Sequence, residues 1–296
     1  MKYSIYMFII ILFGFGANAQ IPDETFLIDI DATYETWECI RYDPYDGQCE
    51  EWGWVTHSSH YKGDLYKVKS TKTSINKNSM LIVEGFDANN SMYFPELWEA
   101  FNRQNLAECI LDNGYDIFIL NFHNPTQSIY KNAEIVKEAI NKIKNEIQNT
   151  NNELIVVGGS MGGLVTRVAL RDMELSEENT QTRLWVSFDS PQKGANIPLG
   201  VQYLINQLIY ELPSDKTEDL KTARNVLRSV AAKQMLLYHF DYDGSPAPEF
   251  TSFFNDINSK GLPETSRNIA ITNGASDGTG QGFNPETLLL SFYVRK

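Results

Sequence analysis

A pentapeptide near the middle of the chain has the residue types and the spacing of a nucleophilic serine. Gly158-Gly159-Ser160-Met161-Gly162 satisfies the pattern G-x-S-x-G, between an apolar run, Leu154 to Val157, and a helical pattern, Leu164 to Met173. In so tight a turn between strand and helix, the glycines remove Cβ atoms that would collide, and the serine hydroxyl is lifted above the strand ends. The N-terminus of the following helix favours negative charge on a bound oxygen. We therefore predict that Ser160 is the nucleophile of an acyl-transfer reaction.

Glycine-rich turns before helices also bind phosphate groups, which is the main alternative for this segment. The glycines here do not form a G-x-G-x-x-G pattern, and no Lys-Ser or Lys-Thr pair follows them. The sequence therefore favours the nucleophile over a phosphate-binding loop.

The residues around Ser160 resemble a known family. Val157 to Arg167 (VGGSMGGLVTR) is similar to the V-G-H-S-M-G-G-L-V-A-R run of secreted lipases and related α/β-hydrolases, with Gly159 in the place of the frequent His. Ser190 to Ala195 (SPQKGA) resembles the T-P-H-x-G segment that follows the next strand in lipases. The resemblance covers roughly residues 80 to 200. It implies an α/β-hydrolase fold, with a mostly parallel central sheet and helices on both faces.

A narrower resemblance concerns hydrolase-like modules of large secreted proteins of Bacteroidota. It rests on EGFD at 84–87, on the serine run, and on FDSPQKGANIPLG at 188–200. It implies that this chain is one module of a longer protein.

An oxyanion hole needs two backbone N–H donors. Met161 follows the nucleophile directly, so its N–H is the expected first donor. The resemblance to lipases places the second donor in the loop after the strand at 80–83, where this chain has Glu84-Gly85-Phe86-Asp87, and it assigns the N–H of Phe86. Glu84 and Asp87 depart from the family pattern, and hydrogen bonds that pin the loop are their simplest role.

The acid and the base of a triad are expected in the chain order serine, acid, histidine. Asp277 follows Gly274-Ala275-Ser276 after an expected strand and is the first choice for the acid; the alternatives are Asp189 as the acid and a plain turn role for Asp277. The four histidines, His57, His60, His123 and His239, all precede Asp277. His123 follows an expected strand and His239 lies in an expected insertion, so both stay open as the base. His57 and His60 are expected on the surface.

The expected histidine loop would begin where the sequence ends. An apolar run, residues 288–294, is expected to be the last strand, and Lys296 follows it. Truncation of the chain, a degenerate hydrolase and a displaced base all explain this. We favour truncation, because an apolar strand is an unusual end for a protein.

The N-terminus is typical of a secretory signal. Lys2 is followed by the apolar run Ile5 to Phe13 and by Ala17-Asn18-Ala19, which fits the rule for cleavage. We expect residues 1–19 to be removed and the mature chain to be secreted, to the periplasm or outside the cell. No later stretch has the length of a membrane span, so the mature chain is expected to lack an integral membrane segment.

The three cysteines give two expectations. Cys39 and Cys49 flank a turn-rich segment and could form a disulfide in an oxidising compartment. Cys109 lies in an apolar helical pattern, which favours a buried free thiol. The sequence shows no Cys/His cluster with zinc spacing, and the chemistry implies no metal or organic cofactor.

The order of patterns predicts one α/β-hydrolase-like domain over residues 20–296. Residues 20–78 are expected to form short antiparallel strands of the same sheet, and strand–helix alternation begins at position 80. Residues 197–263 interrupt the alternation with a helical insertion, for which a lid over the site and plain packing helices are both open. The other predicted elements are strands at 80–83, 115–122, 154–157, 184–188 and 268–272 and helices at 95–111, 131–148, 198–211 and 217–238.

Two classes of function remain, and a peptidase is a further option within the chemistry of the first. The first is a secreted serine hydrolase that acts on carboxylic esters, with an ester or lipid as substrate. The second is a non-catalytic binding module, or an inactive fragment, which the missing downstream histidine favours. The net charge of −13, with acidic residues scattered along the chain, argues against nucleic acid as a partner. The sequence leaves the oligomeric state open.

Overall fold

The computed structural model describes the backbone of residues 22–42, 49–70, 72, 78–147 and 153–272. Side chains are described over the same ranges except 29–42, 49–60 and 146–147. The expected signal peptide at residues 1–19, the acid candidate Asp277 and the expected last strand at 288–294 lie outside these ranges. The predicted Cys39–Cys49 bridge also falls on side chains outside them and stays a prediction.

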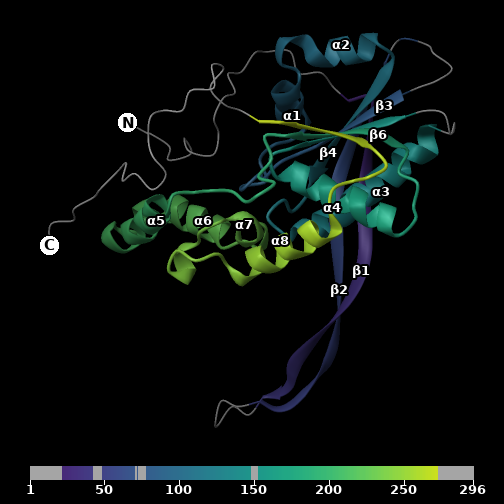
Figure 1. Cartoon of the computed structure of the whole chain (residues 1–296). Coiled ribbons are helices and arrows are strands. Elements are labelled where there is room, and N and C mark those ends of the chain that lie inside the picture. The colour runs from purple at the N-terminus through teal and green to yellow at the C-terminus, as the bar shows by residue number, and fades with distance from the viewer. Residues whose placement is uncertain (1–21, 43–48, 71, 73–77, 148–152, 273–296) are drawn as a thin grey trace.

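In the described part of the chain, seven strands form one mixed sheet in the order β1-β2-β4-β3-β5-β6-β7 (Figure 1). The neighbours from β4 to β7 are parallel, whereas β1, β2 and β4 pair antiparallel. This confirms the predicted mostly parallel sheet. The strands are Glu24–Tyr42 (β1), Cys49–Val68 (β2), Asn78–Val83 (β3), Tyr115–Phe122 (β4), Leu154–Gly159 (β5), Thr182–Phe188 (β6) and Arg267–Ile271 (β7).

β1 and β2 form a long hairpin rather than the short strands predicted for this region. They pair with each other from Glu24 to Tyr42, while β2 pairs with β4 only over Gly63–Val68. The remainder of the hairpin leaves the sheet and projects from the body of the molecule (Figure 1). The prediction of length was wrong because the polar interruptions that suggested strand ends lie inside continuous strands.

Helices cover both faces of the sheet. On one face, Phe94 and Trp98 of α1 and Ala107 of α2 share a buried cluster with Ile117 and Ile119 of β4. On the other face, α3, α4, α7 and α8 contribute to the larger core. The helices are Phe94–Phe101 (α1), Leu106–Asp112 (α2), Ile129–Ile147 (α3), Met161–Leu175 (α4), Leu199–Glu211 (α5), Glu218–Leu227 (α6), Val230–Met235 (α7) and Pro248–Lys260 (α8).

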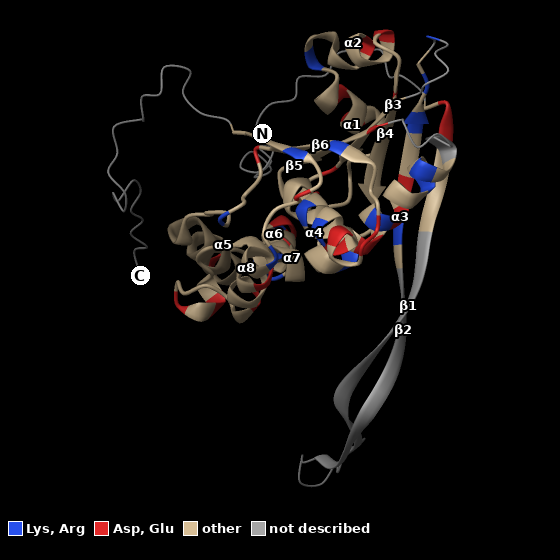
Figure 2. Cartoon of the chain, turned by 45° about the vertical axis from the view of Figure 1, so that its right-hand side comes forward, with Lys and Arg blue, Asp and Glu red and all other residues tan. Residues whose placement is uncertain are grey.

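Four of these helices, α5 to α8, lie between β6 and β7, where the sequence predicts the insertion at 197–263. They gather at one side of the sheet (Figure 1). The charged residues are distributed over the helices (Figure 2), in keeping with the scattered charge pattern of the sequence. None of the helices within the described residues is both long and apolar enough to cross a membrane.

Two predicted helices are broken. The helix expected at 95–111 is interrupted between α1 and α2, because Gln104 and Asn105 have positive φ angles of 56° and 60°. The helix expected at 217–238 ends at Leu227, and Ser229 caps α7 by accepting a hydrogen bond from Ala232 N. Helix α8, Pro248–Lys260, lies within the predicted helical insertion but was not itself among the predicted helices.

The prediction of a buried Cys109 was wrong. Its side chain is exposed, because α2 is a short helix on which only Ala107 is buried. The apolar pattern that suggested burial belongs to a longer helix than the one that forms.

Candidate active site

Ser160 is the single residue between β5, which ends at Gly159, and α4, which begins at Met161. Its φ of 49° and ψ of −123° lie in a region that non-glycine residues rarely adopt, at a typical cost of about 1–3 kcal/mol. The Ser160 N–H donates to the carbonyl of Phe188 at the end of β6, at 2.8 Å, and its own carbonyl accepts from Gly163 N at 3.1 Å. The residue is exposed. The backbone thus holds the strained turn at an exposed position.

The glycines around Ser160 are required by packing at three of four positions. A Cβ on Gly158 would collide with the backbone of Gly162, and a Cβ on Gly162 with the backbone of Glu84. A Cβ on Gly163 would lie 2.5 Å from the Oγ of Ser190. A Cβ on Gly159 would meet nothing within 4 Å.

The loop after β3 lies directly against Ser160, as the prediction of an oxyanion loop requires. A Cβ on Gly85 would lie 3.1 Å from the Ser160 Cβ and 3.7 Å from its Oγ. Met161 is fully buried, and the partly buried Phe86 packs against both the main core and the helical insertion. The roles of Met161 and Phe86 as donors remain predictions.

Asp87 pins this loop through its side chain. Its carboxylate accepts hydrogen bonds from the backbone N–H groups of Asn89 (3.3 Å), Ser91 (2.5 Å) and Met92 (2.7 Å). An Asp that accepts several backbone N–H groups commonly fixes a turn in this way. The loop is therefore held in one conformation beside the nucleophile.

Glu84 is a buried carboxyl group at the start of the same loop. Its Oε1 accepts a hydrogen bond from the backbone N–H of Phe122 at the end of β4. Burial raises the pKa of Glu84 to about 9; the charge of Asp87 adds to the rise, and the bond from Phe122 opposes it. These surroundings favour the neutral carboxylic acid of Glu84 over its carboxylate. Sequence analysis gave it only a pinning role, and its place directly after an apolar strand was the available signal.

Neither His123 nor His239 is directed at Ser160. His123 follows β4, and its Nε2 lies 3.1 Å from Oδ2 of Asp64 on β2. In the strand order, β2 lies on the side of β4 away from β3 and β5, so this contact turns the imidazole away from the nucleophile.

His239 is completely buried within the helical insertion. Its Nε2 bonds to the carbonyl of Leu227 at 2.9 Å, and its Nδ1 accepts from Asp241 N at 3.1 Å. Both ring nitrogens are therefore occupied, which contradicts the suggestion that this residue could serve as the base. The side chains of His57 and His60 lie outside the described residues.

Of the two candidate acids, Asp189 lies within the described residues and Asp277 does not. Asp189 follows β6 with a φ of 46°; its N–H donates to Ile271 O at 2.7 Å, and its Oδ1 accepts from Thr272 Oγ1 at 3.4 Å. Asp189 therefore joins the ends of β6 and β7, a structural role. Asp277 lies outside the described residues, so its assignment as the acid stays a prediction.

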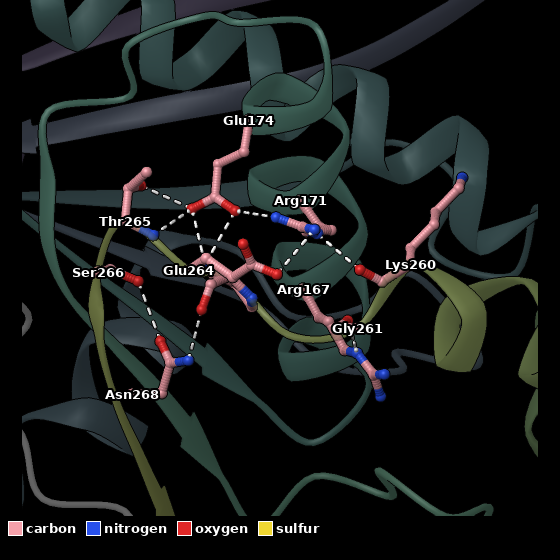
Figure 3. Close-up of polar contacts among 10 residues, drawn as sticks. Arg167, Arg171, Glu174, Lys260, Gly261, Glu264, Thr265, Ser266 and Asn268 are labelled. Carbon is pink, nitrogen blue, oxygen red and sulfur yellow. Dashed lines mark hydrogen bonds and ion pairs between the residues drawn. The ribbon is translucent and has the colours of Figure 1, made fainter.

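A clamp on α4 positions the return of the chain from the insertion into β7 (Figure 3). Glu174 accepts hydrogen bonds from the backbone N–H groups of Glu264 and Thr265 and from the Thr265 hydroxyl. Arg171 donates to Glu174 at 3.0 Å and to the carbonyl of Lys260 at 2.6 Å. The helix that begins at Ser160 thus also fixes the start of the last described strand.

Arg167 extends this connection toward the nucleophile, and sequence reasoning missed it. It is buried and donates to the carbonyls of Ile257 (2.8 Å) and Gly261 (3.1 Å) and to the side chain of Gln192 (3.2 Å). Gln192 in turn donates to the Oγ of Ser190 at 3.2 Å. The signal was present, because Arg167 is the only charged residue in an otherwise apolar stretch, and a buried charge is normally paired.

A comparison with protein families agrees with this geometry. Residues 111–238, a little under half of the chain, match the PGAP1-like alpha/beta domain family. The matched segment contains the elbow at Ser160, within a mostly parallel sheet. The match and the mostly parallel sheet together indicate an α/β-hydrolase fold. No curated protein matches its sequence significantly.

Several solved structures are distantly similar to this chain. A Bacillus licheniformis lipase in its propeptide form is 14% identical over 70% of this chain, with a TM-score of 0.43. A metagenomic carboxyl esterase is 17% identical over 69% of this chain, with a TM-score of 0.38. A peroxisomal alpha-beta-hydrolase of Saccharomyces cerevisiae is 11% identical over 84%, with a TM-score of 0.37. The chain spans 38%, 52% and 83% of these proteins, respectively.

Proposed function

We propose that this α/β-hydrolase is a secreted serine hydrolase that cleaves carboxylic esters through an acyl-enzyme on Ser160. The observation that carries the proposal is the exposed Ser160 on a strained turn, with the Gly85 loop packed against it. Such strain is retained where the surrounding structure holds it, and it is typical of functional sites.

In the proposed reaction, the Ser160 Oγ attacks the ester carbonyl carbon and its proton passes to a base. The N–H groups of Met161 and Phe86 hold the oxyanion of the tetrahedral intermediate. The base returns the proton to the departing alcohol, and a water molecule then releases the acyl group by the reverse sequence. Asp277 is our proposed acid, and the base is not assigned.

The helical insertion supports an apolar substrate such as a lipid or another bulky ester. Several of its large apolar side chains are exposed and so are available for contact with an apolar substrate. They are Tyr203, Tyr210, Leu212, Val230 and Tyr238. In a series of p-nitrophenyl esters, this proposal expects kcat/KM to rise from acetate to longer acyl chains; a steady fall would contradict the apolar substrate but not the nucleophile.

The decisive experiment is labelling of the purified full chain with a fluorophosphonate, which reacts only with an activated serine. We expect one label on Ser160 and none in Ser160→Ala. A folded wild-type chain that takes no label would overturn the proposal. Circular dichroism on the same samples shows that the chain is folded.

A non-catalytic module is the second candidate. The observation in its favour is that His123 faces Asp64 and His239 is occupied within the insertion. This candidate predicts no label on Ser160 at any pH, together with an unchanged fold.

A further inference from the structure

The side chain of Glu84 takes the place of a main-chain group at the end of β3. Glu84 N donates to Leu120 O at 3.2 Å, which continues the parallel ladder between β3 and β4. At the next rung, the Phe122 N–H donates to the Glu84 carboxyl. In a regular parallel ladder this N–H would meet a backbone carbonyl of the neighbouring strand.

Because the side chain of Glu84 makes this hydrogen bond, the backbone can leave the sheet and approach the nucleophile. The Glu84 carbonyl lies against Gly162, where there is no room for a Cβ, and Gly85 then lies against Ser160. The carboxyl group therefore anchors the loop at the point where its backbone turns away from β4.

Two buried side-chain oxygens near this point lack a hydrogen-bond partner within the described residues. They are Oε2 of Glu84 and Oδ1 of Asn121. The register pairs Val83 with Leu120, so the next positions, Glu84 and Asn121, are neighbours on adjacent strands. The backbones of adjacent strands lie about 4.8 Å apart. Two orphaned buried acceptors side by side would destabilise the fold.

One proton resolves both orphans. A carboxylic acid has an O–H donor, and the amide oxygen of Asn121 is an acceptor. We propose that Glu84 is a positioning residue: as a neutral acid it accepts from Phe122 N through Oε1, donates through Oε2 to Asn121 Oδ1, and so fixes the Phe86 loop against Ser160. Its effect on catalysis rests on the proposed hydrolase function, whereas its protonation does not.

A bound cation is the alternative reading of two unpartnered oxygens, and the surroundings disfavour it. Asp87 is engaged by three backbone N–H groups, and Asp64 faces His123. The free oxygens of Glu84 and Asn121 alone are too few for Ca²⁺, which takes six to eight oxygen ligands. No metal-binding cluster is found among the described residues.

The groups that face Glu84 also favour its neutral form. Asp87 lies in its own loop, and its negative charge disfavours a second one nearby. From β2, Tyr66 lies within range of Glu84, Asp64 and Asn121, all of which act on the pKa of its hydroxyl. The negative charge that acts on Glu84 itself is that of Asp87.

The first test compares Glu84→Gln with Glu84→Leu in fluorophosphonate labelling. Glutamine retains an acceptor for Phe122 and supplies an N–H donor for Asn121, so it mimics the neutral acid; leucine supplies neither. We expect labelling within about twofold of wild type for E84Q and at least tenfold slower labelling for E84L. Equal loss in both variants would show that a carboxylate or a cation is needed, and equal retention would show that the residue positions nothing.

The pH profile separates this role from mere packing. We expect wild-type labelling to fall as the pH rises through about 9, and E84Q to lack this loss. Asn121→Leu, which removes the acceptor of the proton, should shift the wild-type fall to lower pH. The proposal is overturned if E84Q and wild type share one profile.

A readout without catalysis keeps the two proposals distinct. Infrared spectroscopy of the full chain at pH 7 should show a protonated carboxyl band in wild type that is missing in E84Q. If the band is present and no serine is labelled, the hydrolase proposal fails and the neutral acid stands. If Ca²⁺ removes the band and raises the wild-type melting temperature, a cation site replaces the neutral acid.

Discussion

Gly85 lies directly against Ser160, so close that a Cβ on Gly85 would come within 3.1 Å of the Ser160 Cβ and 3.3 Å of the Gly159 carbonyl. These contacts are with backbone and with a short side chain, neither of which can rotate away. Gly85→Ala should therefore push the loop from the nucleophile and slow fluorophosphonate labelling by about 10- to 100-fold, as expected when oxyanion donors are displaced.

The matched control for this change is Gly159→Ala, one residue before the nucleophile. A Cβ there meets nothing within 4 Å, and its φ is not in the left-handed region. We expect G159A to label at a rate close to wild type. Equal damage from both alanines would contradict the account of Gly85.

Ser160→Gly separates the strain of the turn from its chemistry. Glycine adopts a φ of 49° at no steric cost, and Ser160 makes no side-chain capping bond to α4. The variant should lose all labelling and yet gain about 1 kcal/mol in the free energy of unfolding, measured with urea. A variant that is less stable than wild type would show that the hydroxyl contributes to the fold.

The parallel core of the sheet could be predicted from sequence because its strands are short apolar runs with clear ends. The strands β3, β4 and β5 and the elbow at Ser160 follow from that pattern and from the glycines. The breaks at Asn105 and Ser229 were missed, since left-handed residues and a single cap override a continuous helical period.

The site could be predicted only where its residues are adjacent in sequence or follow adjacent strands. Met161 adjoins Ser160 by sequence, and the loop at Gly85 meets it because β3 and β5 are adjacent strands. The surroundings of His123 and His239 depend on contacts with Asp64 and Leu227, which no local pattern encodes. The surroundings of these two histidines are therefore set by tertiary packing.

His123→Ala tests whether the contact with Asp64 is structural. Because the imidazole faces β2, we expect labelling of Ser160 within about twofold of wild type in H123A. Loss of labelling in a well-folded H123A would identify His123 as the base and overturn our placement.

His239→Ala should instead lower the melting temperature, since it empties a buried site and leaves the Leu227 carbonyl without its donor, at a cost of about 1–3 kcal/mol.

Glu174 should give the clamp on β7 a pH dependence in acid. Burial raises its pKa, but hydrogen bonds from Thr265, Glu264 and Arg171 outweigh burial and lower it. A lowered pKa means stability that is present above about pH 4.5 and lost as the pH falls through the folded value. Glu174→Gln should therefore be less stable than wild type at pH 7, by about 1–2 kcal/mol, with the gap closing below pH 4.5. Glu178→Gln, at an exposed carboxylate just beyond the same helix, is the control and should show no gap.

Glu84 should act in the opposite direction over a different range of pH. Its folded pKa, about 9, lies above the ordinary value of 4.5, so between these limits the folded chain holds a proton that the unfolded chain has lost. Stability must then fall as the pH rises, by up to about 1.4 kcal/mol per pH unit, and level off above pH 9. Glu84→Gln has no such proton, so its free energy of unfolding relative to wild type should increase steadily from pH 5 to pH 9. Urea unfolding of both proteins at each pH measures the difference. A constant difference across this range would mean that Glu84 is ionised in the fold, and that the loop beside Ser160 is held by a carboxylate.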